Sequence, residues 1–157
     1  MVPPDLLARL ASLGKPIVWT LHDMKPFTGG CHYSSGCEGY VRACSNCPQL
    51  KYDPFGLPNR VIKQKTELFN KIPLVIACPS QWLANEAKKS SVFRNHRIEV
   101  IPNSVETELF KPVSKIKAKQ ELGIKEDQCV LQFGAHDGKE RRKGFHLLIS
   151  ALKKALE

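Results

Sequence analysis

Three short runs rich in apolar and β-branched residues limit the folds that this chain can adopt. They cover residues 16–21, 74–78 and 97–101, and stretches with apolar residues at helical spacing separate them, at 59–70 and 80–89. Runs of this kind are typical of strands buried in a sheet, and strands that alternate with helices run in the same direction. The sequence therefore predicts an α/β fold built on a parallel sheet.

Two further stretches complete the first part of the chain. Residues 5–13 have apolar positions at helical spacing and stop at Gly14, a common helix terminator. Residues 22–57 carry almost no periodicity. An irregular segment of that length is uncommon in a compact domain, and it is usually functional or held by something other than a core.

A His-Asp pair directly follows the first predicted strand. These two residues are His22 and Asp23, and a turn with Thr28, Gly29 and Gly30 lies just beyond them. Residues at the carboxyl end of a parallel strand point into the crevice where open α/β sheets bind ligands. We therefore take the pair as candidate catalytic residues and the turn as a candidate cleft loop. The alternative is that the histidine caps the strand and the aspartate starts a turn.

The last third of the chain shows a second set of elements. After a connector, the pattern predicts a helix over 114–122, a strand over 128–133 and an amphipathic helix over 144–157. One strand flanked by two helices cannot cover its own apolar faces. We therefore expect the start of a second domain here.

These patterns define three parts of the chain. Residues 1–103 are expected to form the second half of one α/β domain with a cysteine-rich loop at 24–57, residues 104–113 a linker, and residues 114–157 the start of a second, truncated domain.

The net charge of +9, from 24 Lys and Arg against 15 Asp and Glu, suits an anionic partner. Most of the positive charges are spread along the chain, and residues 139–143 are the one dense basic cluster. A stripe that binds nucleic acid would be more concentrated. We therefore do not expect a nucleic-acid partner, whereas nucleotide phosphates or an anionic lipid surface fit the charge.

The sequence also bears on location. No run of 18 apolar residues is present, and the first residues lack the basic start and apolar run of a secretory signal. We expect a cytoplasmic protein, with the inner face of the membrane as a place of peripheral contact.

Four of the six cysteines lie close together in the irregular segment, at Cys31, Cys37, Cys44 and Cys47. Four sulfurs in one loop suit a tetrahedral structural zinc, in which His32 is able to replace one thiolate. One C-x-x-C is present, so disulfide pairing and free structural thiols stay open as alternatives, although a cytosolic chain seldom keeps disulfides. Cys78 and Cys129 fall on predicted strands and are expected to be small buried residues.

An ordered series of motifs resembles the family 4 glycosyltransferases, in particular those that build bacterial capsule and exopolysaccharide. The motifs are PIVWTLHDM at 16–24, TGGCHY at 28–33, CSNCPQL at 44–50, PSQWL at 79–83, IPNSVETELFKP at 101–112 and RKGF at 142–145. The resemblance covers nearly the whole chain from Gly14 onward. The series is far more specific than any single motif.

The resemblance implies a GT-B architecture, in which two Rossmann-like domains face each other across a cleft. The first domain binds the acceptor and the second binds the nucleotide-sugar donor. The expected activity is a retaining, hexosyltransferase-like transfer of a sugar from a nucleotide-diphosphate sugar to a glycan or lipid-linked acceptor in polysaccharide synthesis, with no catalytic cofactor. The family's histidine, which contacts the transferred sugar, corresponds to His22, and Asp23 lies beside it at the cleft.

The resemblance also implies that Lys143 lies near the donor diphosphate. Arg141, Arg142 and Lys143 precede the last predicted helix, whose free N–H groups and partial positive charge favour an anion. Positive charge here stabilises the leaving phosphate in the transition state. Gly134, at the end of the strand predicted over 128–133, belongs to the same donor-binding group.

Two departures from the family pattern stand out. Many relatives carry an arginine after the glycine that corresponds to Gly134, whereas this chain has Ala135. The family's carboxylate pair, which holds the donor, lies beyond Glu157, and the glycine-rich loop of the first domain lies upstream of this chain. We therefore expect a central fragment of a glycosyltransferase that is inactive on its own.

Two alternatives remain open at this point. A zinc-stabilised nucleic-acid-binding module explains the charge and the cysteine cluster, but it gives no role to the His-Asp pair. A non-catalytic remnant of a truncated glycosyltransferase gene explains the motifs without activity.

Overall fold

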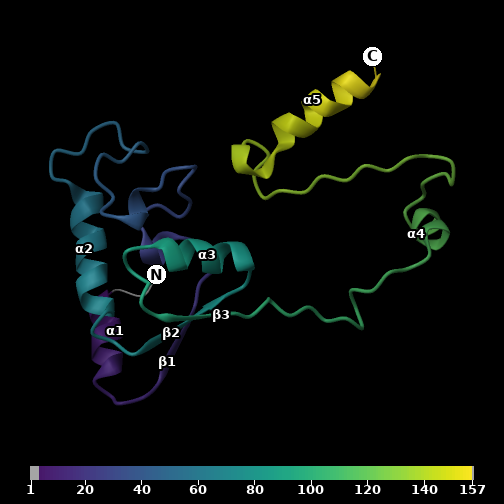
Figure 1. The fold of residues 1–157 in the computed structure, drawn as a ribbon. Helices are drawn as coiled ribbons and strands as arrows, with labels where there is room; N and C mark the ends of the chain where they lie inside the picture. Colours follow the sequence, from purple (N-terminus) through teal and green to yellow (C-terminus); the bar gives the residue numbers. More distant parts are fainter. Residues whose placement is uncertain (1–3, 157) are drawn as a thin grey trace. The chain divides into compact units, whose positions relative to one another are not determined.

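The computed structural model describes residues 4–156, and the chain divides into two compact units, Met1–Val105 and Glu106–Glu157 (Figure 1). The division falls within the predicted connector. Residues 1–3, part of the stretch in which we found no secretory signal, lie outside the described residues. Within residues 4–156, no helix combines the length and the apolar character needed to cross a bilayer.

The first unit is built on a three-stranded parallel sheet with the order β1-β2-β3. The strands are β1 (Ile17–Thr20), β2 (Leu74–Cys78) and β3 (Arg97–Val100). The central strand pairs with both neighbours, so that Val75 lies opposite Val18 on one side and Arg97 on the other. The predicted α/β class and the parallel direction of the three segments are confirmed.

Three helices accompany this sheet: α1 (Pro4–Ala11), α2 (Leu57–Phe69) and α3 (Gln81–Lys89). Local signals set their ends. Gly14, after α1, has a φ of +67°, a backbone conformation that glycine adopts at little cost. Pro58 lies in the first turn of α2, where its missing N–H and fixed φ suit a helix. Ser80 caps α3, because its hydroxyl accepts the N–H of Leu83 at 3.2 Å.

An aromatic cluster lies at the centre of the core. Phe93 is fully buried and stacks on Phe69, with ring centroids 5.9 Å apart. Trp19 of β1 meets both rings edge-on. Phe27, which belongs to the irregular segment after β1, also contacts Phe93. The segment that follows β1 is therefore packed into the core, and this packing fixes its position.

Residues 21–56, between β1 and α2, contain two short 3-10 turns, η1 (Lys25–Phe27) and η2 (Gly39–Val41), and otherwise irregular chain. Tyr40 anchors this segment: its ring is buried, and its hydroxyl donates to the carboxylate of Glu86 on α3. The carbonyl of Tyr40 accepts the N–H of Ser91 at 3.0 Å. Burial and the neighbouring Glu86 carboxylate raise the pKa of Tyr40 well above its usual range.

The second unit contains α4 (Lys115–Glu121), a 3-10 turn η3 (Arg141–Lys143) and α5 (Phe145–Leu156). Both predicted helices are confirmed. The predicted strand is wrong, because residues 128–133 form none, and Cys129, expected to be buried, is exposed. A strand satisfies its backbone N–H and C=O groups through a neighbouring strand, and the described residues of this unit provide no such neighbour.

Candidate functional site

The carboxyl end of β1 carries the His-Asp pair. The β ladder continues one residue past the strand, because the N–H of Leu21 donates to the carbonyl of Ala77 at 2.8 Å, and the chain then leaves the sheet. His22 is exposed at this edge, and Asp23 is half-buried. The structure thus places both residues where the sequence predicted them. Their role in catalysis stays a prediction.

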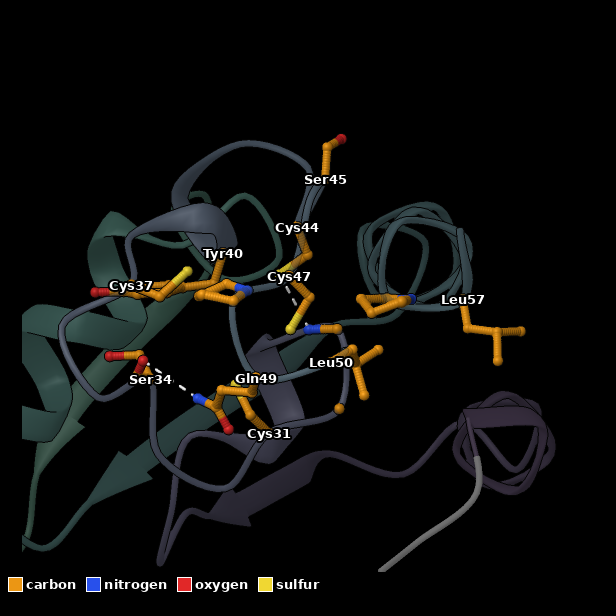
Figure 2. Close-up of a pocket in the computed structure, with 14 residues that line it drawn as sticks. Cys31, Ser34, Cys37, Tyr40, Cys44, Ser45, Cys47, Gln49, Leu50 and Leu57 are labelled. Carbon is orange, nitrogen blue, oxygen red and sulfur yellow. Dashed lines mark hydrogen bonds between the residues drawn. The ribbon is translucent and has the colours of Figure 1, made fainter. Parts of the chain in front are cut away.

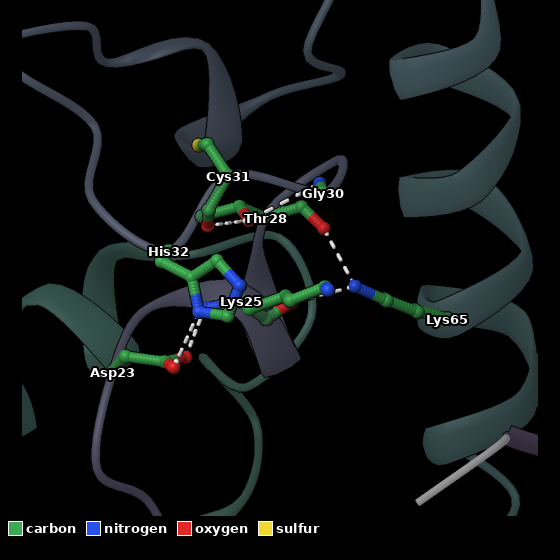
Figure 3. A network of polar contacts seen from close by, with 7 residues as sticks. All are labelled: Asp23, Lys25, Thr28, Gly30, Cys31, His32 and Lys65. Atoms are coloured by element: carbon green, nitrogen blue, oxygen red, sulfur yellow. Dashed lines mark hydrogen bonds and ion pairs between the residues drawn. The ribbon is translucent and has the colours of Figure 1, made fainter. Parts of the chain in front are cut away.

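Asp23 has a partner that the sequence did not reveal. One carboxylate oxygen, Oδ2, lies 2.7 Å from Nδ1 of His32, and the other, Oδ1, accepts the N–H of Lys25 at 2.8 Å (Figure 3). The N–H of Met24 donates to the carbonyl of His32 at 2.9 Å. Sequence reasoning offered His32 as a zinc ligand, whereas the structure pairs it with the aspartate at the sheet edge.

The predicted cleft loop folds as a tight turn that leads to His32. The hydroxyl of Thr28, which is fully buried, donates to the carbonyl of Cys31 at 2.7 Å and accepts the N–H of Gly30 at 3.2 Å. Gly29 packs against the start of α2, where a Cβ would lie 2.6 Å from the carbonyl oxygen of Pro58. Glycine at this position therefore permits the close approach of loop and helix.

A buried lysine ties this turn to α2. Lys65 is 4% exposed, and its Nζ donates to the carbonyls of Lys25 at 2.6 Å and Thr28 at 2.8 Å (Figure 3). Both partners are neutral oxygens, so the buried charge gains no ion pair from them. Burial, with a smaller contribution from the positive charge of Lys25, lowers the pKa of Lys65 to about 8.

Sequence reasoning missed Lys65, although a signal was present. Lys65 lies on the same face of α2 as the buried residues Ile62 and Phe69, at helical spacing from each. A lysine inside an apolar stripe must either reach solvent or find hydrogen-bond acceptors. Here it finds two carbonyls of the chain that follows β1, those of Lys25 and Thr28.

The four clustered cysteines line one cavity of about 350 Å³ in the irregular segment (Figure 2). All four cysteines are free thiols. The other residues that line the cavity include Leu50, Leu57 and Pro58. Backbone N–H groups point at two of the sulfurs: Gly29 donates to Cys44 at 3.2 Å, and Gly39 donates to Cys37 at 3.3 Å. Burial raises the pKa of the Cys44 thiol.

These thiols share a cavity without forming a ready metal site. Across residues 4–156, no group of three or more His, Cys, Asp and Glu side chains is arranged to hold a metal ion. The zinc expected from the cysteine spacing therefore stays a prediction, and it requires the sulfurs to move inward.

The predicted phosphate-binding cluster forms η3, directly before α5. Glu140 caps this turn: its carboxylate accepts the N–H of Arg142 and also pairs with the Arg142 guanidinium at 3.2 Å. This arginine holds the pKa of Glu140 below its usual range. Arg141 and Lys143 are exposed. The cluster therefore presents charge at the start of a helix, with one of its three cations already engaged by a carboxylate.

Gly134, the remaining predicted donor-binding residue, is exposed and follows irregular chain. A Cβ built there would meet no atom within 4 Å, so its surroundings do not require glycine.

Comparisons with known proteins give a consistent result. Residues 2–109 match the family Glycosyltransferase Family 4. The chain is also 31% identical over 121 residues to the putative colanic acid biosynthesis glycosyl transferase WcaC of Escherichia coli (strain K12), in an alignment that covers 69% of this chain and 29% of that protein. The chain thus spans about three tenths of the length of this curated relative. No solved structure matches the chain.

Proposed function

Because the chain belongs to glycosyltransferase family 4, of the type found in capsule and exopolysaccharide synthesis, we propose that it carries part of the machinery that transfers a sugar from a nucleotide-diphosphate sugar. The acceptor is a glycan or a lipid-linked glycan, and the anomeric configuration is retained. The reaction needs no catalytic cofactor and takes place on the cytoplasmic side, at the inner face of the membrane.

One observation carries this proposal. The family match over residues 2–109 contains the whole parallel sheet and the edge at which the chain leaves β1. At that edge the structure gathers two histidines and an aspartate, His22, His32 and Asp23, on a loop that is packed into the core. Open α/β sheets bind their ligands at such an edge.

The proposed roles follow from position and chemistry. His22, exposed at the sheet edge, contacts the transferred sugar, and Asp23 positions the histidines around it. In the second unit, Arg141, Arg142 and Lys143 bind the donor diphosphate. Positive charge at this place stabilises the departing nucleotide, because negative charge builds on the leaving phosphate.

The proposal is tested on the natural protein that carries these residues. That protein is incubated with UDP-glucose, UDP-galactose, GDP-mannose or GDP-fucose, each with and without an oligosaccharide acceptor from the polysaccharide of its source. We expect release of a nucleoside diphosphate that depends on the acceptor, with one or two donors strongly preferred. Release that is absent with every donor, or equal with and without acceptor, would contradict the proposal.

A structural zinc belongs to the same proposal. The irregular segment has few backbone hydrogen bonds of regular structure, and its four thiols surround one cavity. When these sulfurs close on Zn²⁺ at Zn–S distances of about 2.3 Å, the metal holds the segment as a core would.

Elemental analysis of protein purified without chelator tests the zinc. We expect about one equivalent of zinc in the unaltered chain and in Cys129→Ser, whose cysteine is exposed elsewhere, and a large loss in Cys47→Ser. Less than about one tenth of an equivalent, together with four freely titratable thiols, excludes the site.

A further inference from the structure

We infer that His32 and Asp23 form a preorganised site for a hydroxyl group of the acceptor sugar, in which His32 Nε2 accepts the hydroxyl hydrogen and Asp23 fixes the imidazole tautomer. The inference rests on the proposed function, since it names the substrate that the sheet edge receives. It adds His32 as a second histidine that contacts substrate. His32 was not among the predicted catalytic residues, His22 and Asp23.

The two carboxylate oxygens of Asp23 have different hydrogen-bond partners. Its Oδ1 accepts the N–H of Lys25 at 2.8 Å, which orients the carboxylate. Its Oδ2 then faces Nδ1 of His32 at 2.7 Å. A carboxylate accepts hydrogen bonds and donates none, so this contact requires a proton on Nδ1. When the imidazole carries this one proton, the other ring nitrogen, Nε2, is an acceptor.

The outward side of His32 is available to a ligand. Its side chain is 56% exposed, and the hydrogen bond to Asp23 is made by Nδ1, on the other side of the ring from Nε2. The imidazole is held at Nδ1 while its opposite side faces outward. This is the arrangement in which a histidine binds a ligand atom in a fixed direction.

The charge at the site favours a neutral donor over an anion. The Asp23 carboxylate lies 2.7 Å from the imidazole, and its negative charge repels phosphate and carboxylate groups. A sugar hydroxyl provides the hydrogen that Nε2 accepts. The donor diphosphate instead fits the basic turn η3 of the second unit. The ligand of His32 is therefore a sugar hydroxyl, and the acceptor glycan is its source.

The loop that carries His32 is held in place by a buried lysine, whose burial is energetically unfavourable. Lys65 buries its ammonium to donate to the carbonyls of Lys25, the first residue of η1, and Thr28, which directly follows η1. Burying a cation without an ion pair is unfavourable. The N–H of Met24 adds a bond to the carbonyl of His32. Together these contacts fix the backbone at both partners of the Asp23–His32 pair, which is what an oriented binding group requires.

The tautomer is tested first, by ¹⁵N NMR of the histidine rings in this chain. We expect His32 to carry its proton on Nδ1. In Asp23→Asn the amide oxygen keeps the Lys25 N–H, so the amide nitrogen faces His32 and the proton moves to Nε2. The inference is overturned if His32 is protonated on Nε2 in the unaltered chain.

Sugar binding is tested in the same spectra. Methyl galactoside and methyl glucoside are added at millimolar concentrations, and the Nε2 resonance of His32 is followed. We expect a saturable shift that is lost in Asp23→Asn, while the resonance of buried His96 stays in place. If neither sugar perturbs Nε2, the inference fails.

Kinetics on the natural protein separates this inference from the proposed function. His32→Asn retains an amide that donates to Asp23 but removes the outward nitrogen. We expect it to raise the KM for the acceptor about tenfold with little change in the KM for the donor, since one hydrogen bond is lost. Lys51→Ala, an exposed change in the same segment, is the control.

Two results have different meanings. An active His32→Asn variant with unchanged acceptor KM overturns the role of His32 and leaves the glycosyltransferase proposal intact. If the unaltered protein shows no transfer while the sugars still shift the Nε2 resonance, the proposed reaction is wrong and the sugar site stands.

Discussion

The two units of this chain differ in what holds their elements. In the first unit, Phe93 and Phe69 are buried among side chains from distant segments. In the second, Lys119 is the one buried side chain among the described residues, and α5 keeps apolar residues such as Leu147 and Leu156 largely exposed. Helices are present in both units, whereas across residues 4–156 strands are present in the first unit alone. A helix satisfies its backbone within one segment, and a strand needs a partner.

The largest expected effect is a loss of stability from a substitution in the core of the first unit, and it tests the difference between the two units. Phe93→Ala removes a ring that contacts Phe69, Phe27 and Trp19, so we expect the free energy of unfolding to fall by about 3–5 kcal/mol. Leu152→Ala, on the partly exposed face of α5, should change it by about 0.5 kcal/mol or less. Urea unfolding followed by tryptophan fluorescence and by circular dichroism measures both. Equal losses for the two variants would mean that α5 contributes to a shared core.

The same contrast explains what could be predicted from the sequence. Helical spacing and capping residues such as Ser80 act within a few residues, and the predicted helices were confirmed. The strand predicted over 128–133 was wrong because an apolar run does not show whether a partner strand is present. The position of His22 followed from the end of β1. The contact of Asp23 with His32 lies within an irregular segment, where no periodicity could reveal it. Helical spacing marked Lys65 as a residue of the buried face of α2, but it gave no sign of its contact with Thr28.

The next effect concerns chemistry at the sheet edge of the first unit. His22→Ala removes a side chain that is exposed beside the ordered Asp23–His32 pair. In the natural protein we expect kcat to fall by about 10²-fold, the loss typical of a positioned catalytic group, with little change in nucleotide affinity. Steady-state kinetics and calorimetric titration with the donor measure the two quantities, with Lys51→Ala as control. A variant with normal turnover would remove His22 from the catalytic site.

In the second unit, the corresponding substitution is expected to weaken binding of the donor. Lys143→Ala removes a cation before α5 whose side chain is exposed, and we expect the donor to bind about 1.5–3 kcal/mol more weakly. Arg142→Ala should cost less, because Glu140 already pairs with that guanidinium. Lys153→Ala, in the last turn of α5, is the control for general charge loss. Calorimetry at two salt concentrations measures all three, and an unchanged donor affinity in Lys143→Ala would exclude the phosphate role.

The smallest expected effect concerns Lys65, which joins α2 to the turn at Lys25 and Thr28. The pKa of Lys65 falls from its ordinary 10.5 to about 8 in the folded chain. Between these two pH values the unfolded chain binds a proton that the folded chain has released, so the free energy of unfolding rises with pH. The burial penalty acts in full below about pH 8. Tyr40 and Cys44, whose pKa values are raised by burial, act in the opposite direction once they titrate in the unfolded chain.

The contribution of Lys65 is therefore measured as a difference between variants. We compare the unaltered chain with Lys65→Met, which keeps the length of the side chain without its charge, and with Lys63→Met, an exposed change on the same helix. From about pH 8 to pH 10, the unaltered chain and Lys63→Met should gain about 1–2 kcal/mol relative to Lys65→Met. Urea unfolding at several pH values measures this gain. Parallel pH profiles for all three chains would show that Lys65 keeps its proton in the folded state, and that the loop before His32 is held by a fully charged lysine throughout.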